Sequence, residues 1–506
     1  MKKLQFPTAH SVLLIIAALV ALSTWLIPAG KYEQLGYNKE KKVFIHYTKD
    51  GETEHPPTQA TLDHFLIKAK LEKFTKGDIW KPIGIPGTYY EVEANPQGVV
   101  DFIQSPLIGI GGDGGKNHGA IDVILFVLII GGFIGVVHHT GAFDAGIASL
   151  ARVLKGRETL LIIIITCLIA LGGTTFGLAE ETIAFYPILV PVFLVAGYDA
   201  IVALGAIYIG SSIGTMASTV NPFSAIIASD AAGINWTSGL YGRLFMLIVG
   251  TTICLWYIIR YAERVRKNPE YSIIYDQKEQ IEARFIHNKE SKNEVVFDAR
   301  IQLVLIVFAA CFGVMIYGVS GLGWWFLEMT TVFFVGAILI GLIAGVGEKP
   351  FVEAFVKGAN DLLSVALIIG IARGVTVLMD QGMISDTLLY YSSNTVEGMP
   401  KGIFVNVMMF LYAGLSFFIP SSSGMAVLSM PVMAPLADVV EAPREMVVNA
   451  YQYGMGLMAF ITPTGLILAS LDMVGVTYNK WLKFVMPLLL ILTIFTMIVL
   501  TILVYM

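Results

Sequence analysis

The sequence predicts an all-α polytopic membrane protein, on the basis of its composition, its long apolar runs and an internal repeat. Apolar residues make up 56% of the 506 positions and charged residues 14%, whereas soluble domains carry about 25% charged residues. So few charges cannot cover a polar surface, so most of the exterior faces lipid. The formal net charge of −5 gives no basic excess for binding nucleic acid. The three cysteines lie within apolar runs, which argues against a disulfide framework.

The chain opens with an apolar run at residues 11–27, preceded by Lys2 and Lys3. A cleaved signal peptide has a similar start, but this run approaches the roughly 20 residues that cross a bilayer, and many apolar runs follow it. We therefore expect residues 1–30 to form the first transmembrane helix. The next stretch, residues 31–117, is the longest polar one and is expected to be an extracytoplasmic segment.

Basic residues set the expected orientation, because lysine and arginine near the ends of spans stay in the cytoplasm. They gather at Arg152, Lys155 and Arg157, at Arg260, Arg264, Arg266 and Lys267, at Lys349 and Lys357, and at Lys480 and Lys483. The second cluster opens a linker at residues 261–299, which we expect in the cytoplasm together with the N-terminus. Tryptophans at run ends, among them Trp25, Trp236 and Trp481, are expected to be interfacial rings. The predicted location is the bacterial inner membrane, with multiple passes.

An internal repeat relates residues 118–260 to residues 300–506. Pro187 and Pro191 match Pro431 and Pro435, Asn221-Pro222 matches Thr462-Pro463, and Asp230 with Gly233 matches Asp472 with Gly475. The basic clusters give the two copies opposite orientations. Inverted-topology repeats are typical of secondary transporters, whose substrate sites lie near the midplane where broken helices of both halves meet. We therefore predict two inverted-topology repeats, each with a re-entrant helical hairpin and a discontinuous transmembrane helix.

Each repeat contains a small or polar patch within an apolar stretch, at residues 172–182 and 420–424. The flanking apolar segments of about 12 to 18 residues fall short of a full crossing. Irregular backbone at such depth is tolerated only where it lines a cavity or packs within protein, so we interpret both patches as tips of re-entrant hairpins. The candidate binding residues at these tips are Glu180, Glu181 and Thr182 in the first repeat, and Ser421, Ser422, Ser423 and Gly424 in the second.

A second interruption follows in each repeat, where Pro222 and Pro463 are expected to unwind a helix, because proline lacks an N–H and crowds the preceding turn. Unwinding frees carbonyl groups for a cation and exposes helix N-termini that attract a carboxylate. The polar residues expected to complete the site are Ser218, Thr219, Asn221, Thr462 and Thr464. A sodium site is a candidate near Asn221 and Thr462, and a purely structural kink is the alternative.

These motifs resemble those of YfcC-like members of the anaerobic four-carbon-dicarboxylate carrier (DcuC-like) family, within the ion transporter superfamily. The resemblance rests on the opening of the chain, from Phe6-Pro7-Thr8 to residues 25–32, on Phe176-Gly177-x-x-Glu180-Glu181, on Asn221-Pro222-Phe223 and on residues 420–424. It implies two inverted repeats, a homodimer and transport domains that move as elevators. It also favours basic amino acids and antiport. Better-known dicarboxylate transporters of the superfamily carry Ser-Asn-Thr at both tips, which this chain lacks, so their sodium and dicarboxylate chemistry is not implied.

Charged residues within apolar runs are costly and usually functional. Glu180 and Glu181 are adjacent carboxylates at a predicted tip, which would favour a cation: an amine, a sodium ion or a proton. The alternative is that one of them caps the following half-helix. Arg373 lies in the body of an apolar run and would either bind a substrate carboxylate in bidentate fashion or neutralise a glutamate in the scaffold.

The sequence therefore predicts a secondary active transporter of a small carboxylate-bearing metabolite, with antiport of a basic amino acid favoured and coupling to Na⁺ or H⁺ as a further option. A C4-dicarboxylate carrier is the alternative within this class. An intramembrane enzyme with Glu180 and Glu181 as its acid–base pair is a remote alternative. No cofactor is expected, and the glycine-rich stretch at residues 109–117 is no phosphate loop, because Asn117 stands where a serine or threonine is required.

Overall fold

The computed structural model describes residues 8–67, 71–76, 82–112, 119–143, 145–146, 157–285, 298–322, 324–395 and 399–506. Lys2, Lys3, Asn117, Arg152 and Lys155, which entered the sequence arguments, lie outside these ranges. The described chain is mostly helical, and eight of its helices are long and apolar enough to cross a membrane. They include Ile121–His139, Leu240–Lys267, Phe326–Ala344, Leu363–Gln381 and Tyr478–Leu503. The protein is therefore a multi-pass membrane protein.

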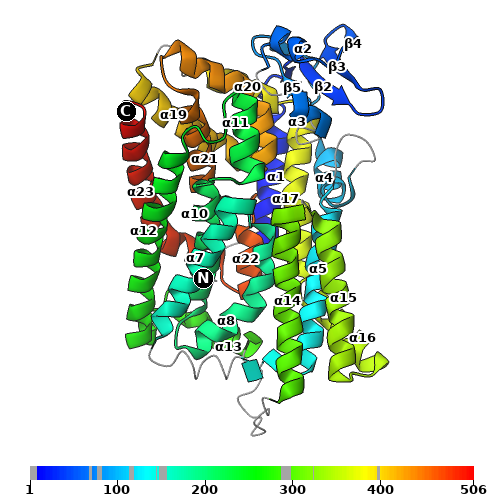
Figure 1. Cartoon of the computed structure of the whole chain (residues 1–506), viewed down its shortest axis with the longest axis vertical. Helices are drawn as coiled ribbons and strands as arrows, with labels where there is room; N and C mark the ends of the chain where they lie inside the picture. Colours follow the sequence, from blue (N-terminus) through cyan, green and yellow to red (C-terminus); the bar gives the residue numbers. More distant parts are fainter. Residues whose placement is uncertain are drawn as a thin grey trace.

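The helices form two bundles that lie side by side (Figure 1). The first, which we call the straight-helix bundle, occupies the right of that view. It consists of α1 (Ala9–Ser23), α4 (Val99–Gly111), α5 (Ile121–His139), α14 (Ala299–Leu322), α15 (Phe326–Ala344), α16 (Glu348–Asp361) and α17 (Leu363–Gln381). Its main contacts join α5 to α15 and α16, and α17 to α1 and α4. Both halves of the sequence therefore contribute to one bundle.

Glycines allow close crossings within this bundle. A Cβ added at Gly131 of α5 would lie 2.5 Å from the carbonyl oxygen of Gly358 in α16, and one added at Gly135 would lie 2.4 Å from that of Ala354. Real Cβ atoms do not approach backbone oxygen so closely, so only glycine fits. Such small-residue contacts let membrane helices pack backbone against backbone without a hydrophobic driving force.

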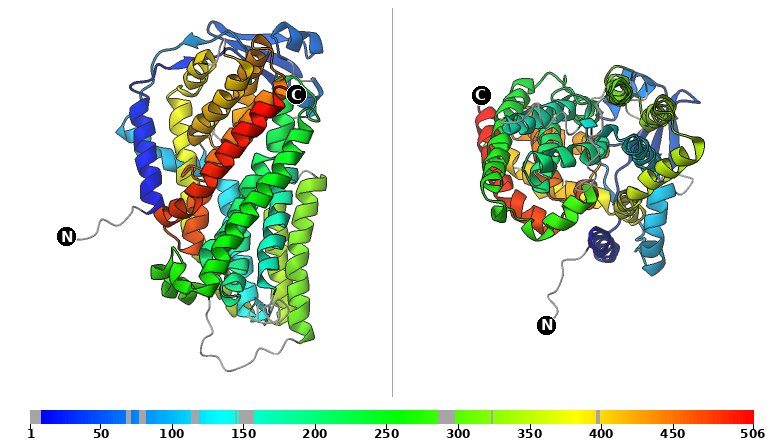
Figure 2. Two further views of the ribbon diagram at one scale, coloured as in Figure 1. Left: turned by 90° about the vertical axis from the view of Figure 1, so that its left-hand side faces the viewer. Right: turned by 90° about the horizontal axis from the view of Figure 1, so that it is seen from below.

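The second bundle, which we call the broken-helix bundle, lies to the left and contains the interrupted segments (Figure 1). Its first-half elements are α7 (Glu158–Phe176), η1 (Glu180–Phe185), α8 (Tyr186–Val195), α9 (Ala200–Leu204), η2 (Gly205–Ile209), α10 (Gly210–Met216), η3 (Pro222–Ile226), α11 (Ile227–Ala232) and α12 (Leu240–Lys267). Its second-half elements are α19 (Lys401–Phe418), α20 (Ser422–Val439), α21 (Arg444–Ala459), α22 (Ile467–Val474) and α23 (Tyr478–Leu503). The long helices α12 and α23 lie side by side along one face (Figure 2).

The expectation that the apolar segments beside the two patches fall short of a full crossing is wrong for three of the helices. The apolar parts of α7, α19 and α20 each span 18 residues, which suffices by length and composition to cross a membrane. The helices α8 and α22 lie towards the lower end in Figure 1, whereas α11 and α20 lie towards the upper end. The elements after equivalent breaks thus lie towards opposite ends of the molecule.

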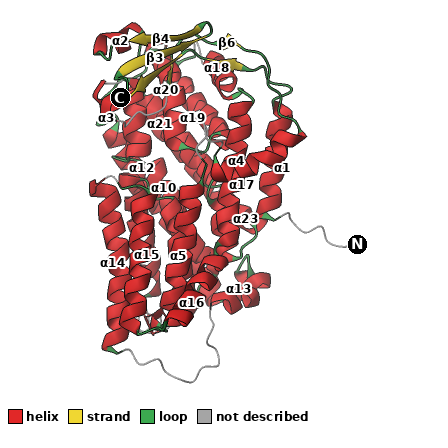
Figure 3. Ribbon diagram, turned by 90° about the vertical axis from the view of Figure 1, so that its right-hand side faces the viewer, coloured by secondary structure: helices red, strands yellow, loops and turns green. Residues whose placement is uncertain are grey.

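A small antiparallel sheet covers the end of the molecule opposite α13 (Lys278–Phe285) and α16, as Figure 3 shows. Its strands run in the order β4 (Gly51–His55), β3 (Val43–Thr48), β2 (Gln34–Asn38) and β5 (Ile83–Gly84). A separate pair joins β1 (Gly30–Lys31) to β6 (Tyr90–Glu91). The short helices α2 (Gln59–His64) and α3 (Leu71–Lys76) cover the larger sheet. Residues 31–117 therefore contain an ordered unit that the sequence did not reveal.

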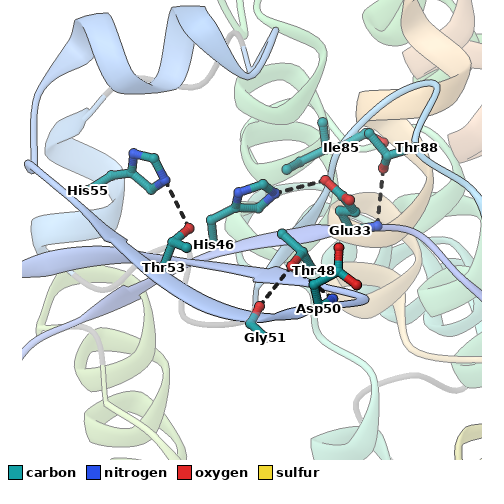
Figure 4. A network of polar contacts seen from close by, with 9 residues as sticks. All are labelled: Glu33, His46, Thr48, Asp50, Gly51, Thr53, His55, Ile85 and Thr88. Carbon is teal, nitrogen blue, oxygen red and sulfur yellow. Dashed lines mark hydrogen bonds and ion pairs between the residues drawn. The ribbon is translucent and has the colours of Figure 1, made fainter.

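The sheet is fastened both to itself and to the broken-helix bundle. His46 Nε2 lies 2.9 Å from Glu33 Oε2, and the backbone N–H of Glu33 donates to Thr88 Oγ1 (Figure 4). The apolar core beneath the sheet, which includes Leu35, Phe44 and Ile83, is completed by Val427 of α20. At its other edge, Asp386 of α18 (Ser385–Thr395) accepts from the backbone N–H of Tyr32 at 3.0 Å.

The linker between the two halves is also held in place. It contains η4 (Pro269–Tyr271), η5 (Tyr275–Gln277) and α13. Asp199, which caps α9, accepts 2.6 Å hydrogen bonds from Tyr261 of α12 and from Ser272 of the linker. Lys480 donates to Asp276 at 2.9 Å, and Arg284 donates to the carbonyl oxygen of Asp472. The linker therefore packs against the ends of several helices of the broken-helix bundle.

Candidate functional site

The unwound segment after α10, residues 217–221, is called the first break. It is held by hydrogen bonds to the end of α7. Thr174 Oγ1 donates to the carbonyl oxygen of Ala217 at 2.7 Å and accepts from the backbone N–H of Thr219 at 2.9 Å. Asn221 Nδ2 donates to the carbonyl oxygen of Gly173 at 3.2 Å and lies 3.3 Å from Ser218 Oγ. The unwound backbone thus finds its partners at the end of α7, as buried polar groups must.

Two conformational features allow this arrangement. Gly177 ends α7 with φ +78°, a left-handed conformation that favours glycine, and a Cβ there would lie 3.0 Å from the Asn221 amide. Asn221 Oδ1 accepts from the backbone N–H of Phe223 at 2.9 Å, which starts the π-helical turn η3. Ser218, Thr219 and Asn221 are buried. The structure therefore brings these three predicted residues together at one place.

The unwound segment between α21 and α22, residues 460–466, is called the second break. It is also bonded to the end of a preceding helix, α19, but a different set of side chains donates to its carbonyl oxygens. Thr464 Oγ1 donates to the carbonyl oxygen of Phe417, at the end of α19, at 2.8 Å, and lies 2.8 Å from Thr462 Oγ1. Three aromatic side chains donate to carbonyl oxygens freed by the break: Tyr208 to Ala459 at 2.8 Å, Trp481 to Phe460 at 2.9 Å, and Tyr478 to Ile461. These carbonyls are engaged by the protein itself, and Pro463 lies among buried residues of the same break.

The expectation that Trp481 is an interfacial ring is wrong. Its side chain is 0% exposed, and its indole N–H is the donor to Phe460. A tryptophan at the start of an apolar run is usually placed at the membrane surface. Here the unwound carbonyl offers the N–H a partner in the interior, so the ring can be buried without leaving a polar group unpaired.

The two halves contact each other through the segments that follow their breaks. After the first break, η3 and α11 pack against α20, next to its first residues. After the second break, α22 packs against η1 and α8. The elements that follow the polar patch of each half therefore lie against the segment that follows the other half's break.

The acidic pair lies in this interface. Glu180 and Glu181 begin the 3₁₀ turn η1, which also contacts α5 and α22. Glu181 is 9% exposed, and one of its carboxylate oxygens accepts from the backbone N–H of Ala179 at 3.1 Å. Thr182 donates to the carbonyl oxygen of Ala179 at 2.6 Å. Within the described ranges, neither glutamate forms an ion pair with a lysine, arginine or histidine.

The other predicted tip is a helix cap. Ser421 precedes α20, and its hydroxyl accepts from the backbone N–H of Gly424 at 3.2 Å. The carbonyl oxygen of Ser422 accepts from Tyr451 at 2.7 Å, and Ser423 lies half-buried in the first turn. Pro222 begins η3 in the adjoining segment. Arg373 lies half-buried in α17 of the straight-helix bundle, a helix that packs against α22 after the second break.

Sequence reasoning missed several buried polar residues. Arg243, near the start of α12, is 0% exposed, as is Asn449 of α21, and Gln452 of α21 is 2% exposed. Arg243 had the appearance of a residue at the end of a span, and the two amides sit in a run that is otherwise apolar. The only available signal was an amide pair spaced for one helix face.

A helical membrane protein in which two sets of broken segments meet, with two adjacent glutamates in their interface, has the build of a membrane transporter. The chain belongs to the C4-dicarboxylate anaerobic carrier (DcuC) family, which it matches over residues 6–505. The protein is therefore a carrier and not an enzyme.

Two relatives support this assignment. An uncharacterised protein of Haemophilus influenzae is 45% identical over 490 residues, covering 96% of this chain and 95% of the relative. YfcC of Escherichia coli (strain K12), whose name assigns it provisionally as a basic amino acid antiporter, is 30% identical over 506 residues, covering 95% and 93%. The solved structure of MtrF from Neisseria gonorrhoeae covers 99% of this chain and 96% of its own at 14% identity, with a TM-score of 0.39. That last likeness is too slight to carry an argument.

Proposed function

We propose that this carrier is a secondary active transporter of the bacterial inner membrane that exchanges amino acids, basic ones in particular. The observation that carries this proposal is the acidic pair of half-buried Glu180 and buried Glu181, which has no basic partner among the described residues. Two adjacent carboxylates in an apolar interior repel an anion and attract a cation. The side-chain or α-ammonium group of a basic amino acid supplies that charge, and Na⁺ or H⁺ supplies it when no substrate is bound.

We further propose that the transporter is built from two inverted repeats with re-entrant hairpins and works by an elevator motion. Three features support this proposal. Thr174 and Thr464 bond the break to the hairpin in both halves, and Gly210 and Gly454 allow equivalent close helix crossings, against Thr166 and Met409. In addition, the broken-helix bundle contacts the straight-helix bundle along only a few elements, chiefly α17 with α22 and α5 with η1. In this proposal the broken-helix bundle moves and the straight-helix bundle, in a homodimer, stays fixed.

The proposed orientation in the membrane rests on the position of the basic residues. We place the N-terminus and the linker of residues 261–299 in the cytoplasm, since Arg264, Arg266 and Lys267 end α12 beside the linker. The sheet of residues 31–91 then lies outside. Labelling of introduced cysteines in intact cells tests this orientation. A membrane-impermeant thiol reagent is offered to variants that carry a cysteine at Glu54 or at Glu279. We expect labelling at Glu54→Cys and none at Glu279→Cys.

Counterflow in proteoliposomes tests the substrate. Vesicles loaded with unlabelled arginine, ornithine or succinate are given the radiolabelled counterpart, and we expect exchange with the first two. Glu180→Gln and Glu181→Gln should each lower arginine exchange at least tenfold, whereas Glu263→Gln, a matched change in an exposed ion pair of α12, should leave it unchanged. Exchange of succinate alone, or wild-type exchange in both variants, would contradict the proposal.

A C4-dicarboxylate carrier is the second candidate, and the family description favours it. The same counterflow experiment separates the two, because the acidic pair predicts exclusion of succinate.

A further inference from the structure

Arg243 is a buried charge that the proposed transport site does not use. It lies in the first turns of α12, and none of its side chain is exposed. Its Nη2 donates to the carbonyl oxygens of Trp236 and, at 2.9 Å, Ser238. The Nε and Nη1 atoms have no hydrogen-bond partner in the described part of the chain, and no carboxylate there forms an ion pair with it.

A guanidinium group in this position needs further partners. Burial of an ion costs several kcal/mol unless its charge and its N–H groups are compensated, and the membrane around this bundle provides no compensation. Two backbone carbonyls meet part of the requirement. The remaining N–H groups require an oxygen-bearing group, and its charge should be negative.

Two buried amides of α21 are also without partners among the described residues, and one of them lies against the start of α12. Asn449 of α21 is 0% exposed, and neither Oδ1 nor Nδ2 has a partner among the described residues. Its Nδ2 lies 3.2 Å and 3.6 Å from the positions that Cβ atoms would take at Gly239 and Gly242, the latter adjacent to Arg243. Gln452, 2% exposed, likewise has both amide atoms unpaired there.

The face of α21 that carries the two amides also contacts the helix before the first break. Asn449, Gln452 and Gly456 recur at intervals of three and four residues, so they share one face of α21. That face meets the end of α10, because a Cβ at Gly456 would lie 2.3 Å from Cβ of Met216, the last residue before the break. Tyr453, next to Gln452, donates to the carbonyl oxygen of Gly242 at 3.3 Å. A line of polar groups thus runs from the start of α12 towards the break.

We infer that Arg243, Asn449 and Gln452 form a buried binding site for a carboxylate group. The arginine supplies charge and N–H donors to two oxygens, and the amide nitrogens supply further donors. The amide oxygens remain as acceptors for an ammonium or hydroxyl group on the same ligand. A bare sodium ion would leave Nε and Nη1 of Arg243 and both amide nitrogens unpaired and would add a second positive charge, which excludes it as the occupant.

The carboxylate has two sources, and the inference rests on the proposed function only for the first. One is the carboxylate of a transported amino acid. The other is Glu445 of α21, whose Cβ lies 3.2 Å from the Cβ position at Gly239 and which lies one turn before Asn449. A side-chain rotation of Glu445 would then close the site in the absence of substrate.

Thermal unfolding of the detergent-purified full-length protein, in sodium acetate against sodium chloride at equal concentration, tests the site. Acetate carries a carboxylate and no amine, so it does not require the acidic pair. We expect acetate to raise the unfolding midpoint of the wild type and of the control Arg266→Gln, an exposed arginine at the other end of α12. Arg243→Gln and Asn449→Ala should weaken the acetate response at least tenfold in concentration.

The variant Glu445→Gln separates the sources. If Glu445 occupies the site, this variant unfolds at a lower midpoint in chloride and acetate restores it. If substrate occupies the site, the variant behaves as wild type, and arginine protects it as acetate does. Should Arg243→Gln fail to fold, Arg243→Lys and Asn449→Ala carry the test. An acetate response that is unchanged in these variants, with Glu445→Gln neutral, overturns the inference. Failure of arginine counterflow, with the acetate response intact, contradicts the proposed substrate alone.

Discussion

The two breaks in the broken-helix bundle solve one problem in different ways. At the first break the unwound backbone is paired by small side chains, chiefly Thr174 and Asn221, which belong to the same half of the protein. At the second, Tyr208, Trp481 and Tyr478 donate to three successive carbonyl oxygens. One of these donors, Tyr208, comes from the other half. The second break is therefore supported by large buried rings and the first by short polar side chains.

This difference indicates a division of labour. Large rings packed around a break resist rearrangement, because every displaced ring opens a cavity. Short hydroxyl and amide groups can exchange one partner for another with little change in packing. We therefore expect the first break to adapt during transport and the second to act as a rigid support.

Removing the largest ring tests the second break most severely. Trp481→Ala should destabilise the protein by about 3–5 kcal/mol, since the side chain is fully buried. Trp481→Phe keeps most of the volume but leaves the carbonyl oxygen of Phe460 unpaired, so a smaller loss of about 1–3 kcal/mol is expected. Unfolding in detergent monitored by tryptophan fluorescence or circular dichroism measures both. A variant Trp481→Ala as stable as the wild type would show that the ring is not a support.

Asp386, a buried carboxyl outside both breaks, should make the stability of the protein depend on pH. Burial raises the pKa of Asp386 from 3.8 to about 6. The folded state therefore holds this proton more tightly than the unfolded state, so stability is fully present below about pH 4 and is lost as pH rises through about 6. The loss amounts to about 3 kcal/mol.

Asp386→Asn should remove that pH dependence and leave the protein more stable than the wild type at pH 8, with no gain at pH 4. The melting temperature across this range is the measurement, and Glu328→Gln, at an exposed helix start, is the control. An equal gain at every pH would mean that ionisation of Asp386 is not the cause. In the Asp386→Asn protein, the remaining pH dependence can be compared between wild-type Glu180 and Glu181 and their glutamine variants.

A matched pair of variants separates the roles of the two breaks. Thr174→Val leaves the carbonyl oxygen of Ala217 without this donor and Tyr208→Phe does the same to that of Ala459. Thr174→Val also removes one acceptor of the Thr219 N–H. Each should cost about 1–3 kcal/mol of stability. We expect Thr174→Val to lower amino acid exchange well beyond this, whereas Tyr208→Phe should retain exchange in proportion to folded protein. Equal loss of exchange in both variants would remove the distinction between adaptable and rigid breaks.

The smallest effect is expected in the sheet. His46 and Glu33 form a partly exposed pair, so Glu33→Gln should change stability by at most about 1 kcal/mol. The variant should leave both breaks unchanged, so exchange should stay at the wild-type rate. A large loss of exchange would indicate that the sheet, which rests on α20 through Val427, is coupled to the hairpin.

Several local features could be anticipated from the sequence because their causes are local. Pro222 and Pro463 cannot continue a regular helix, and the chain is unwound immediately before the first of them and around the second. Gly233 and Gly475, matched in the repeat, both end short helices with positive φ, 74° and 80°. The apolar runs predicted the long helices for the same reason, since a lipid-facing helix needs an unbroken apolar sequence.

The sequence by itself determined that this chain enters the membrane many times and where its helices break, because both depend on the chemistry of a few neighbouring residues. Only the tertiary structure decided which groups satisfy those breaks. Tyr208 reaches the carbonyl oxygen of Ala459 in the other half of the chain, and Trp481 reaches that of Phe460. Val427 completes the core of a sheet from the first hundred residues, and Asn449 of α21 lies against Gly239 and Gly242 at the start of α12. A buried polar group must find a partner wherever packing provides one. Which partner that is depends on the arrangement of whole helices, and no local pattern specifies it.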